Sequence, residues 1–302
     1  MNKVLITGST GFVGQNLCPY LENKSMILDK ISRNDLYTIT HERLNGRDIV
    51  IHLAGKAHDL KKTSDGNQYN QVNFELSKSL YDKFLLSDAK VFIFISSVKA
   101  TADSIDAILN EDNFSNPITD YGKSKLLAEQ YIQSQPLPVG KLYIILRPCM
   151  IHGPGNKGNL NLLYQVVKKN IPYPLSAFNN SRSFLSIENL CFVIYNLIIL
   201  KDLESGVYNV ADDEPLSTIE VVGLLSKSLG KNARLWFIPK PVIKSLAKLG
   251  DWLKLPLDTE RLNKLTESYV VSNEKIKRCI KTPLPLSSRE GLILTANSFR
   301  SI

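Results

Sequence analysis

A tyrosine and a lysine one helical turn apart are the residues of this sequence best suited to proton transfer. Tyr121 and Lys125 belong to the stretch "YGKSK", and their spacing places both side chains on one face of a helix. A phenol with a pKa of about 10 is a poor acid or base at neutral pH, but a nearby cation favours the phenolate and lowers that pKa. Ser97, at the end of an apolar stretch, can hydrogen-bond a substrate oxygen. Together the three residues predict a proton transfer that accompanies hydride transfer.

The same tyrosine–lysine spacing occurs three times, so the spacing alone is weak evidence. The other pairs are Tyr20 with Lys24 and Tyr164 with Lys168. Only Tyr121 follows an apolar strand that ends in serines, "FIFISS", and only Tyr121 opens a helix in the first half of the chain. We therefore assign the chemistry to this pair alone.

Three glycines spaced three apart interrupt the first apolar run, "VLITGSTGFVGQNL". Gly8, Gly11 and Gly14 directly follow a predicted buried strand and precede a predicted helix. Glycines let the backbone turn tightly and approach a pyrophosphate, and the helix N-terminus supplies N–H donors. The pattern predicts a dinucleotide site at the end of the first strand.

The end of the second predicted strand, "LDKISRND", indicates which dinucleotide to expect. An acidic residue there would bind a ribose 2′-hydroxyl, whereas an arginine would accommodate a 2′-phosphate. Asp29 lies 15 residues after Gly14, while Ser32 and Arg33 lie 18 and 19 residues after it, nearer the usual distance of about 20. We therefore expect NADP(H), bound by Arg33 and Ser32. The alternative is that Arg33 is a solvated loop residue and the cofactor is NAD(H).

The composition is that of a globular protein with a basic surface. The 302 residues suffice for one large α/β domain or two smaller ones, and the formal net charge is +8. The lysines form no single run with interleaved aromatic residues, so we expect no nucleic-acid partner. A basic cleft for a phosphorylated small molecule is the better explanation of the charge.

The cysteines, the histidines and the longest apolar run argue against several classes of protein. The four cysteines contain no CxxC pair and the four histidines no metal-ligand spacing, so we expect a reducing compartment, no disulfide framework and no metal. The apolar run 190–200 contains Asn196 and is far shorter than the roughly 20 residues of a membrane helix. It predicts a buried helix. With no signal peptide before the first strand, we expect a cytoplasmic protein without membrane insertion.

Near-continuous apolar strands alternate with amphipathic helices in the first half of the chain. This alternation predicts an α/β fold with a doubly wound parallel sheet that is covered on both faces. Ligands of that fold sit beyond the carboxyl ends of the strands. We expect residues 1–150 to form a dinucleotide-binding domain, with a return to the sheet around 183–212. Residues 151–302 would form mostly a smaller, mixed substrate lobe.

Five stretches in this order closely resemble the extended short-chain dehydrogenase/reductases over essentially the whole chain. They are the glycine pattern, "HLAG" at 52–55, "QVNF" with Asn73, "FISS", and the tyrosine–lysine pair. The resemblance implies a Rossmann sheet, a nucleotide-linked sugar as substrate, and Ser97, Tyr121 and Lys125 as catalytic residues. Asn73 would support the cofactor site, or else only cap backbone groups. The residues that we expect at the cofactor are Gly8, Thr10, Gly11, Phe12, Val13, Gly14, Ser32, Arg33, Leu53, Ala54, Gly55, Asn73, Ser96, Tyr121, Lys125 and Pro148.

Comparison within that family narrows the sugar chemistry. The family's dehydratases carry an Asp-Glu pair after the catalytic hydroxyl residue, where this chain has Val98 and Lys99. Its galactose-type epimerases carry "RYFNP" after the sixth strand, where this chain reads "RPCMIHGPG" and lacks the asparagine. The stretches "SSVK", "RPCMIHGPGNKGN" and "PLSAFNNSRSFLSIENL" instead resemble bacterial nucleotide-sugar 4-ketoreductases. Those enzymes reduce UDP-4-keto-6-deoxy-N-acetylglucosamine toward UDP-N-acetylquinovosamine in surface-polysaccharide synthesis.

In addition to Ser97, four further residues are expected to bind the substrate. Arg182, in "SRSFLSI", matches the family's diphosphate-binding arginine, whose forked donors suit phosphate. The alternative is a surface arginine that pairs with Glu188. Lys157 and Asn159 stand in the loop expected over the nucleotide, and Lys99 stands beside the expected sugar position. Each of these three has a solvated or capping role as its alternative.

These residues together predict an NADPH-dependent reduction at C4 of a UDP-linked 4-keto sugar. The cofactor supplies hydride, Tyr121 protonates the forming alkoxide, Lys125 holds ribose and tunes Tyr121, and Ser97 orients the oxygen. Two rivals remain. One is a UDP-hexose 4-epimerase with tightly bound NAD, and the other is a non-enzymatic NADP-binding sensor, which would lack the tyrosine or the lysine. Family members usually form dimers through a helical bundle, so we also expect a homodimer.

Overall fold

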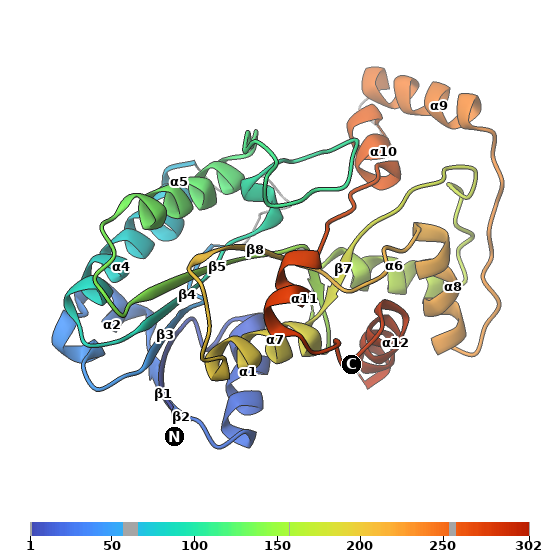
Figure 1. The fold of residues 1–302 in the computed structure, drawn as a ribbon. Helices are drawn as coiled ribbons and strands as arrows, with labels where there is room; N and C mark the ends of the chain where they lie inside the picture. Colours follow the sequence, from blue (N-terminus) through green and yellow to red (C-terminus); the bar gives the residue numbers. More distant parts are fainter. Residues whose placement is uncertain (1, 57–65, 157, 254–257, 302) are drawn as a thin grey trace.

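A six-stranded parallel sheet forms the centre of the computed structural model, which describes residues 2–56, 66–156, 158–253 and 258–301. The strand order is β2-β1-β3-β4-β5-β8 (Figure 1). The strands are β1 (Lys3–Thr7), β2 (Ile27–Ile31), β3 (Ile49–His52), β4 (Val91–Ile95), β5 (Leu142–Pro148) and β8 (Gly206–Val210). The order reverses between β1 and β3, the switch point at which doubly wound sheets bind their ligands. The predicted Rossmann sheet is confirmed.

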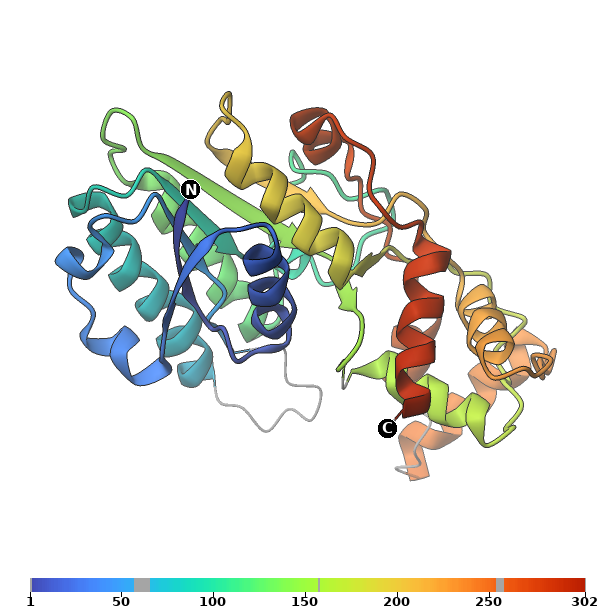
Figure 2. The same ribbon diagram turned by 90° about the horizontal axis from the view of Figure 1, so that it is seen from below.

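Helices cover both faces of this sheet. One face carries α1 (Phe12–Asn23), α7 (Ile187–Ile199) and α11 (Glu274–Ile280), and the other carries α2 (Arg33–Thr38), α4 (Leu76–Leu86) and α5 (Asp120–Ser134). Figure 2 shows α1 and α7 side by side on their face. Alternate strand residues enter the two cores, so that Val4 and Ile6 pack with α1 and α7 while Leu5 packs on the opposite side. Because both faces are buried, the central strands β1, β3 and β4 are nearly continuous apolar runs, whereas the edge strand β2 carries polar residues.

The C-terminal lobe surrounds a small core of its own, to the right of the sheet in Figure 1. Its elements are β6 (Met150–His152), α6 (Asn159–Lys168), β7 (Phe184–Ser186), α8 (Thr218–Ser228), α9 (Lys240–Leu253), α10 (Thr259–Thr266), α12 (Ser288–Ser298) and η4 (Phe299–Ser301). Tyr164, Leu225, Leu292 and Phe299 are buried in this core. The tyrosine of the third tyrosine–lysine pair is therefore a packing residue, remote from the sheet.

The chain crosses between the two lobes more than once. Within the segment 183–212, β8 joins the main sheet beside β5, whereas β7 pairs with β6 outside it. The apolar run 190–200 lies mostly in α7, where Leu190, Val193 and Leu197 are buried. In the part of the chain that the structure describes, no helix is long and apolar enough to cross a membrane. Short helices η1 (His41–Leu44), α3 (Gly66–Tyr69), η2 (Asn70–Glu75) and η3 (Val98–Ala100) connect the larger elements.

Candidate active site

Ser97, Tyr121 and Lys125 come together at the carboxyl end of β4. Ser97 follows β4 and caps η3, where its Oγ accepts a hydrogen bond from the Lys99 backbone N–H at 3.2 Å. Tyr121 lies in the first turn of α5, one turn before Lys125, and its side chain is hydrogen-bonded to that of Ser97. The structure thus brings together the three side chains that the sequence predicts for catalysis.

The start of α5 is held by residues that the sequence analysis did not single out. The Asp103 carboxylate accepts hydrogen bonds from the N–H and the hydroxyl of Thr119, both at 3.0 Å. Thr119 in turn caps α5 by accepting from the Gly122 N–H at 3.2 Å. A Cβ on Gly122 would lie 2.4 Å from the Lys99 carbonyl oxygen. Glycine at this position therefore lets α5 approach the loop that carries Ser97.

Burial sets the protonation states of the tyrosine and the lysine. Lys125 is 5% exposed, and its Nζ donates a hydrogen bond to the Ile95 carbonyl oxygen at 2.8 Å. Burial lowers the pKa of Lys125 to about 8. Burial also raises the pKa of Tyr121, and the hydrogen bond with Ser97 opposes part of that rise. Tyr121 is therefore a protonated phenol at neutral pH and is able to donate its proton.

The glycine turn between β1 and α1 packs against the loop after β3. Gly8 has a φ of +74°, and a Cβ on it would lie 2.6 Å from the Ala54 backbone nitrogen. A Cβ on Gly14 would lie 2.4 Å from the Gly8 carbonyl oxygen. Gly11 is the N-cap of α1 and brings no side chain over the first turn. This backbone cradle at a helix N-terminus fits the pyrophosphate of a dinucleotide.

A chain of buried hydrogen bonds joins this turn to the helix that follows β3. The Ala54 N–H donates to Thr7 Oγ1 at 3.3 Å, Thr7 Oγ1 lies 2.7 Å from His52 Nδ1, and His52 Nε2 lies 2.9 Å from Ser77 Oγ. Ser77 Oγ donates its proton to the Asn73 carbonyl oxygen at 2.7 Å. Because that hydroxyl proton is used, Nε2 of the neutral ring must donate to Ser77, and Nδ1 accepts from Thr7. His52 thus ties the ends of β1 and β3 to the next helix.

We expect His52 to make the fold sensitive to mild acid. Burial, reinforced by the Lys125 charge, lowers the pKa of His52 from 6.5 to about 3. Between these values the unfolded chain binds a proton that the folded chain does not, so the free energy of unfolding falls as pH falls below 6.5. At pH 5 the loss amounts to about 2 kcal/mol. Urea unfolding should be measured at pH 7 and at pH 5 for the wild type and for His52→Asn. Between the two pH values, the free energy of unfolding of His52→Asn should fall by about 2 kcal/mol less than that of the wild type. Equal losses in the two proteins would contradict this prediction.

Asn73 joins the loop after β3 to the catalytic helix. It is fully buried in η2, a π-helical turn of the kind often found at functional sites. Its amide accepts from the Lys56 N–H at 2.7 Å, donates to the Lys56 carbonyl at 3.1 Å, and donates to Ser124 Oγ at 3.1 Å. A Cβ on Gly55 would lie 3.0 Å from Asn73 Oδ1 and 3.2 Å from Lys125 Nζ. Asn73 therefore caps backbone groups of the very loop that the family resemblance assigns to the cofactor.

Asp29, the acidic residue of the second strand, lies inside β2 and is already paired. Its carboxylate accepts hydrogen bonds from Arg43 at 2.6 Å and from Arg47 at 2.8 and 3.0 Å. Two guanidinium groups thus bind this carboxylate. This pairing explains why the acid is present in the strand without requiring a cofactor.

Ser32 and Arg33 follow the last residue of β2, at the carboxyl end of this strand. Ser32 is the N-cap of α2, accepting from the Asp35 N–H at 3.2 Å and donating to the Asp35 carboxylate at 2.7 Å. Arg33 is the first residue of α2 and is exposed. The structure therefore presents an exposed cation at the position that the sequence assigns to a 2′-phosphate.

A buried ion pair lies beneath the catalytic helix. Glu129, one turn after Lys125, is fully buried, and Arg147, near the end of β5, is almost so. Two guanidinium nitrogens of Arg147 meet the Glu129 carboxylate, Nε at 3.0 and 3.1 Å and Nη2 at 2.5 Å. The Ser96 hydroxyl also donates to Glu129. The side chain of Ser96, expected at the cofactor, is thus engaged in this cluster.

Arg182, the residue expected at the diphosphate, is held by the last turn of α10 and the residue that follows this helix. Its guanidinium donates to the carbonyl oxygens of Lys264 and Glu267 and lies 3.2 Å from the Glu267 carboxylate. The pairing with Glu188 that we considered as the alternative is therefore replaced by one with Glu267. Burial, the largest influence, lowers the pKa of Arg182.

The other expected substrate residues lie after β4 and at the start of α6. Lys99 donates to the Asp103 carbonyl oxygen at 2.6 Å, and its ammonium lies 4.6 Å from the ring centroid of Tyr269. The Tyr269 hydroxyl donates to the Ala102 carbonyl at 2.7 Å, which joins the segment between α10 and α11 to the loop after β4. Asn159 is the first residue of α6. Lys157 lies outside the described residues.

The remaining residues expected at the cofactor lie along the same edge of the sheet. Thr10 precedes α1, and Phe12 and Val13 are half-buried in the first turn of this helix. The Leu53 N–H donates a hydrogen bond to the Thr7 carbonyl oxygen at 3.2 Å. Pro148 ends β5 opposite Val210 of β8. In the described ranges, no three histidine, cysteine, aspartate or glutamate side chains are grouped so that they could hold a metal ion.

Comparison with known proteins gives one family. A family model described as "NAD dependent epimerase/dehydratase family" matches residues 4–211. The UDP-glucose 4-epimerase of Vibrio cholerae is 31% identical over an alignment that covers 98% of this chain and 95% of the relative.

Solved structures share the fold over the whole chain. The UDP-glucuronic acid 4-epimerase of Bacillus cereus in complex with NAD matches with a TM-score of 0.76 and 19% identity, covering 99% of each chain. RMD from Pseudomonas aeruginosa, complexed with NADPH, matches with a TM-score of 0.75 and 20% identity, covering 100% of each chain. Proteins of this fold thus bind NAD in one case and NADPH in another, and the fold alone does not distinguish the two cofactors.

Proposed function

The chain belongs to the NAD dependent epimerase/dehydratase family, and from that premise we propose that it uses NADPH to reduce the C4 keto group of a UDP-linked 4-keto-6-deoxy sugar. The family supports an NAD(P)-dependent enzyme that acts on a nucleotide sugar. The direction of the reaction and the phosphate on the cofactor are the parts that we propose. Surface-polysaccharide synthesis, the role of the reductases that the sequence resembles, would consume the product.

The residues at the end of β2 are the observation that carries this proposal. Arg33 is exposed there, while the Asp29 carboxylate is bound by Arg43 and Arg47. A 2′-phosphate favours a guanidinium partner, and a free ribose 2′-hydroxyl favours a carboxylate. NADPH is consumed stoichiometrically by a reductase, whereas an epimerase recycles its bound NAD. The cationic end of β2 therefore favours reduction.

The side chains of the site also favour reduction. The cradle at Gly8 and Gly14 fits the dinucleotide, which when bound supplies the hydride. Tyr121 would donate its phenol proton to the oxygen at C4, and Ser97 would orient that oxygen. Lys125 would stabilise the phenolate left on Tyr121. Because burial keeps Tyr121 protonated, the site is poised in the form that a reductase needs.

Arg33→Ala is expected to raise the KM for NADPH about tenfold to a hundredfold, because a charge-assisted hydrogen bond contributes about 1.5–3 kcal/mol. The KM for NADH should change less than twofold, since NADH lacks the 2′-phosphate. Initial rates with a panel of UDP-4-keto sugars would measure both constants.

Lys30→Ala is the matched control, because it removes a cation three residues away that is paired with Glu22 at 2.7 Å. We expect this variant to keep the wild-type KM for NADPH. A wild-type enzyme that prefers NADH, together with an Arg33→Ala variant that changes neither KM, would rule out the cofactor proposal.

A UDP-hexose 4-epimerase with tightly bound NAD is the second candidate, favoured by the 31% identity with the Vibrio cholerae epimerase along nearly the whole chain. Two measurements separate the candidates. An epimerase should retain dinucleotide absorbance through purification and interconvert UDP-hexoses without added cofactor. A reductase should oxidise one NADPH for each 4-keto sugar consumed.

A further inference from the structure

The outer helix of the C-terminal lobe, α9, has an apolar face that is only half covered. Ile243, Ala247 and Gly250 are buried, and the first two belong to the core of the lobe. A second apolar row is formed by Val242, Leu246, Leu249 and Leu253, which are 45–49% exposed. Their spacing of three or four residues places them in one stripe along the helix. Such a continuous stripe on a surface helix marks an interaction site.

Exposed aromatic side chains lie on α9 and in the segment just before it. Trp252, in the last turn of α9, is 79% exposed, and the segment that leads into the helix carries Trp236 and Phe237, which are 56% and 76% exposed. Both tryptophans of the chain are therefore on or just before α9. Tryptophan and phenylalanine are the residues that interfacial membrane helices place at the boundary between headgroups and acyl chains.

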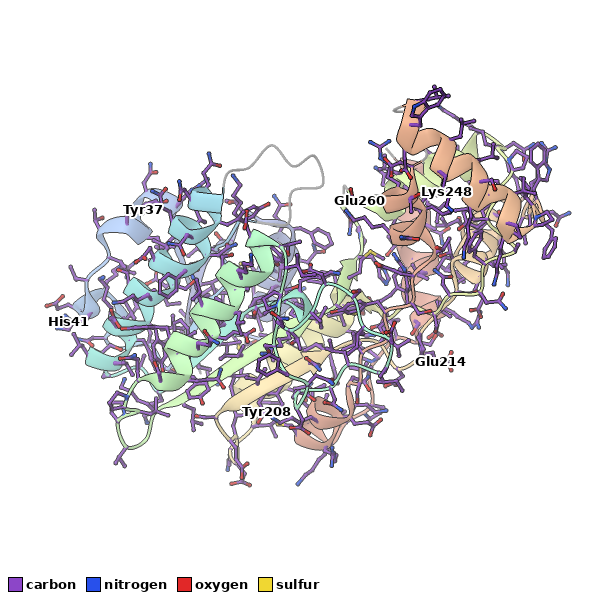
Figure 3. The ribbon with its side chains drawn as sticks, turned by 90° about the horizontal axis from the view of Figure 1, so that it is seen from above. Tyr37, His41, Tyr208, Glu214, Lys248 and Glu260 are labelled. Carbon is purple, nitrogen blue, oxygen red and sulfur yellow. The ribbon has the colours of Figure 1, made fainter. Side chains whose placement is uncertain are left out.

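Positive charge is concentrated on the same part of the chain. Residues 227–253 contain six basic residues and one acid, a net charge of +5 out of +8 for the whole protein. Lys240, Lys244 and Lys248 form a row along α9, and Figure 3 labels Lys248 on this helix, in the lobe that lies apart from the sheet. With about 100° per residue, Trp252 lies between the lysine row and the apolar stripe. The exposed face of α9 thus presents lysines on one side, leucines on the other and an indole between them.

We propose that α9, with residues 235–237, docks the protein on the surface of an anionic phospholipid bilayer. The apolar stripe and the aromatic side chains would enter the headgroup region, and the lysines would reach the phosphates through their long stems. With 14 residues the helix is too short to span a bilayer, so this is contact with one leaflet. A second copy of this chain is the weaker choice of occupant, because two surfaces of net charge +5 would repel each other. This inference does not depend on the reaction that the enzyme catalyses.

The test is co-sedimentation of the full chain with vesicles of phosphatidylcholine alone and of phosphatidylcholine mixed with phosphatidylglycerol. We expect binding to the anionic vesicles only, weakened by high salt because the Debye length shortens. The double variant Leu246→Glu, Leu249→Glu should bind at least tenfold more weakly, and so should Lys244→Glu, Lys248→Glu. The thermal unfolding temperature and the NADPH oxidation rate of both should stay near wild type.

Leu86→Glu is the matched control, because Leu86 ends α4 on the opposite lobe and is 72% exposed. It should bind vesicles as the wild type does. Three results would overturn the proposal. The first is that the wild-type protein does not bind anionic vesicles. The second is that the α9 variants bind these vesicles as well as Leu86→Glu does. The third is that analytical ultracentrifugation shows a wild-type dimer that the α9 variants no longer form.

Discussion

Replacing Tyr121 with phenylalanine is expected to lower the turnover number of the C4 reduction about 10²–10⁴-fold, the range of a positioned general acid. The substitution removes the hydroxyl that is bonded to Ser97 and keeps the ring, which packs edge-on against Tyr69 with 6.0 Å between centroids. The fold and the dinucleotide affinity should therefore stay near wild type. Steady-state rates at saturating NADPH, fluorescence titration of NADPH and thermal unfolding would measure the three quantities separately.

Tyr20→Phe is the matched control for this prediction. Tyr20 has the same spacing to a lysine, Lys24, whose ammonium lies 5.9 Å from the tyrosine ring centroid. It lies on α1, where it packs against Tyr195 on α7. We expect its loss of the hydroxyl to leave turnover within twofold of wild type. A Tyr121→Phe enzyme with near wild-type turnover would show that another group supplies the proton.

Glu129→Ala is expected to lower the free energy of unfolding by about 3–5 kcal/mol, the usual effect of breaking a buried ion pair from one side. The carboxylate accepts hydrogen bonds from Arg147 and from Ser96, and all three residues are buried. Without the carboxylate, the Arg147 guanidinium keeps its charge in an apolar surrounding. Chemical denaturation followed by circular dichroism would measure the change.

Two comparisons separate loss of the ion pair from loss of packing. The double variant Glu129→Met, Arg147→Met should recover most of the lost stability, because it removes both charges and keeps the volume. Lys78→Ala breaks an exposed pair with Asp82 at 2.9 Å and should change stability by less than about 1 kcal/mol. If Glu129→Ala were as mild as Lys78→Ala, the buried pair would not be a main support of the catalytic helix.

Local patterns in the sequence were enough to predict the sheet, the glycine turn and the helix on which Tyr121 and Lys125 lie one turn apart. Each depends on residues that are neighbours along the chain. Gly8 must adopt a positive φ directly after β1, Tyr121 and Lys125 are one turn apart in α5, and the central strands are nearly continuous apolar runs. Periodicity and backbone preference express such relations directly.

The contacts that hold the site together could not be predicted from the sequence, because each of them joins residues that are far apart along the chain. His52 meets Ser77 across 25 residues and Thr7 across 45. Gly122 reads as an ordinary helix residue, and only the approach of α5 to the Lys99 carbonyl shows why a side chain cannot fit there. The pairing of Arg182 with Glu267 across 85 residues likewise has no local signal.

By itself the sequence predicted the class of fold, the glycine turn after β1 and the placement of Tyr121 and Lys125 one turn apart on a helix, because hydrophobic periodicity, glycine conformation and helical spacing are local properties. Tertiary structure alone decided which charges are already paired. It binds Asp29 to Arg43 and Arg47 and leaves Arg33 exposed at the end of β2. It also leaves one apolar stripe of α9 uncovered while it buries the other. The physical reason is that pairing and burial depend on which distant segments the folded chain brings together, and no spacing along the sequence encodes that distance.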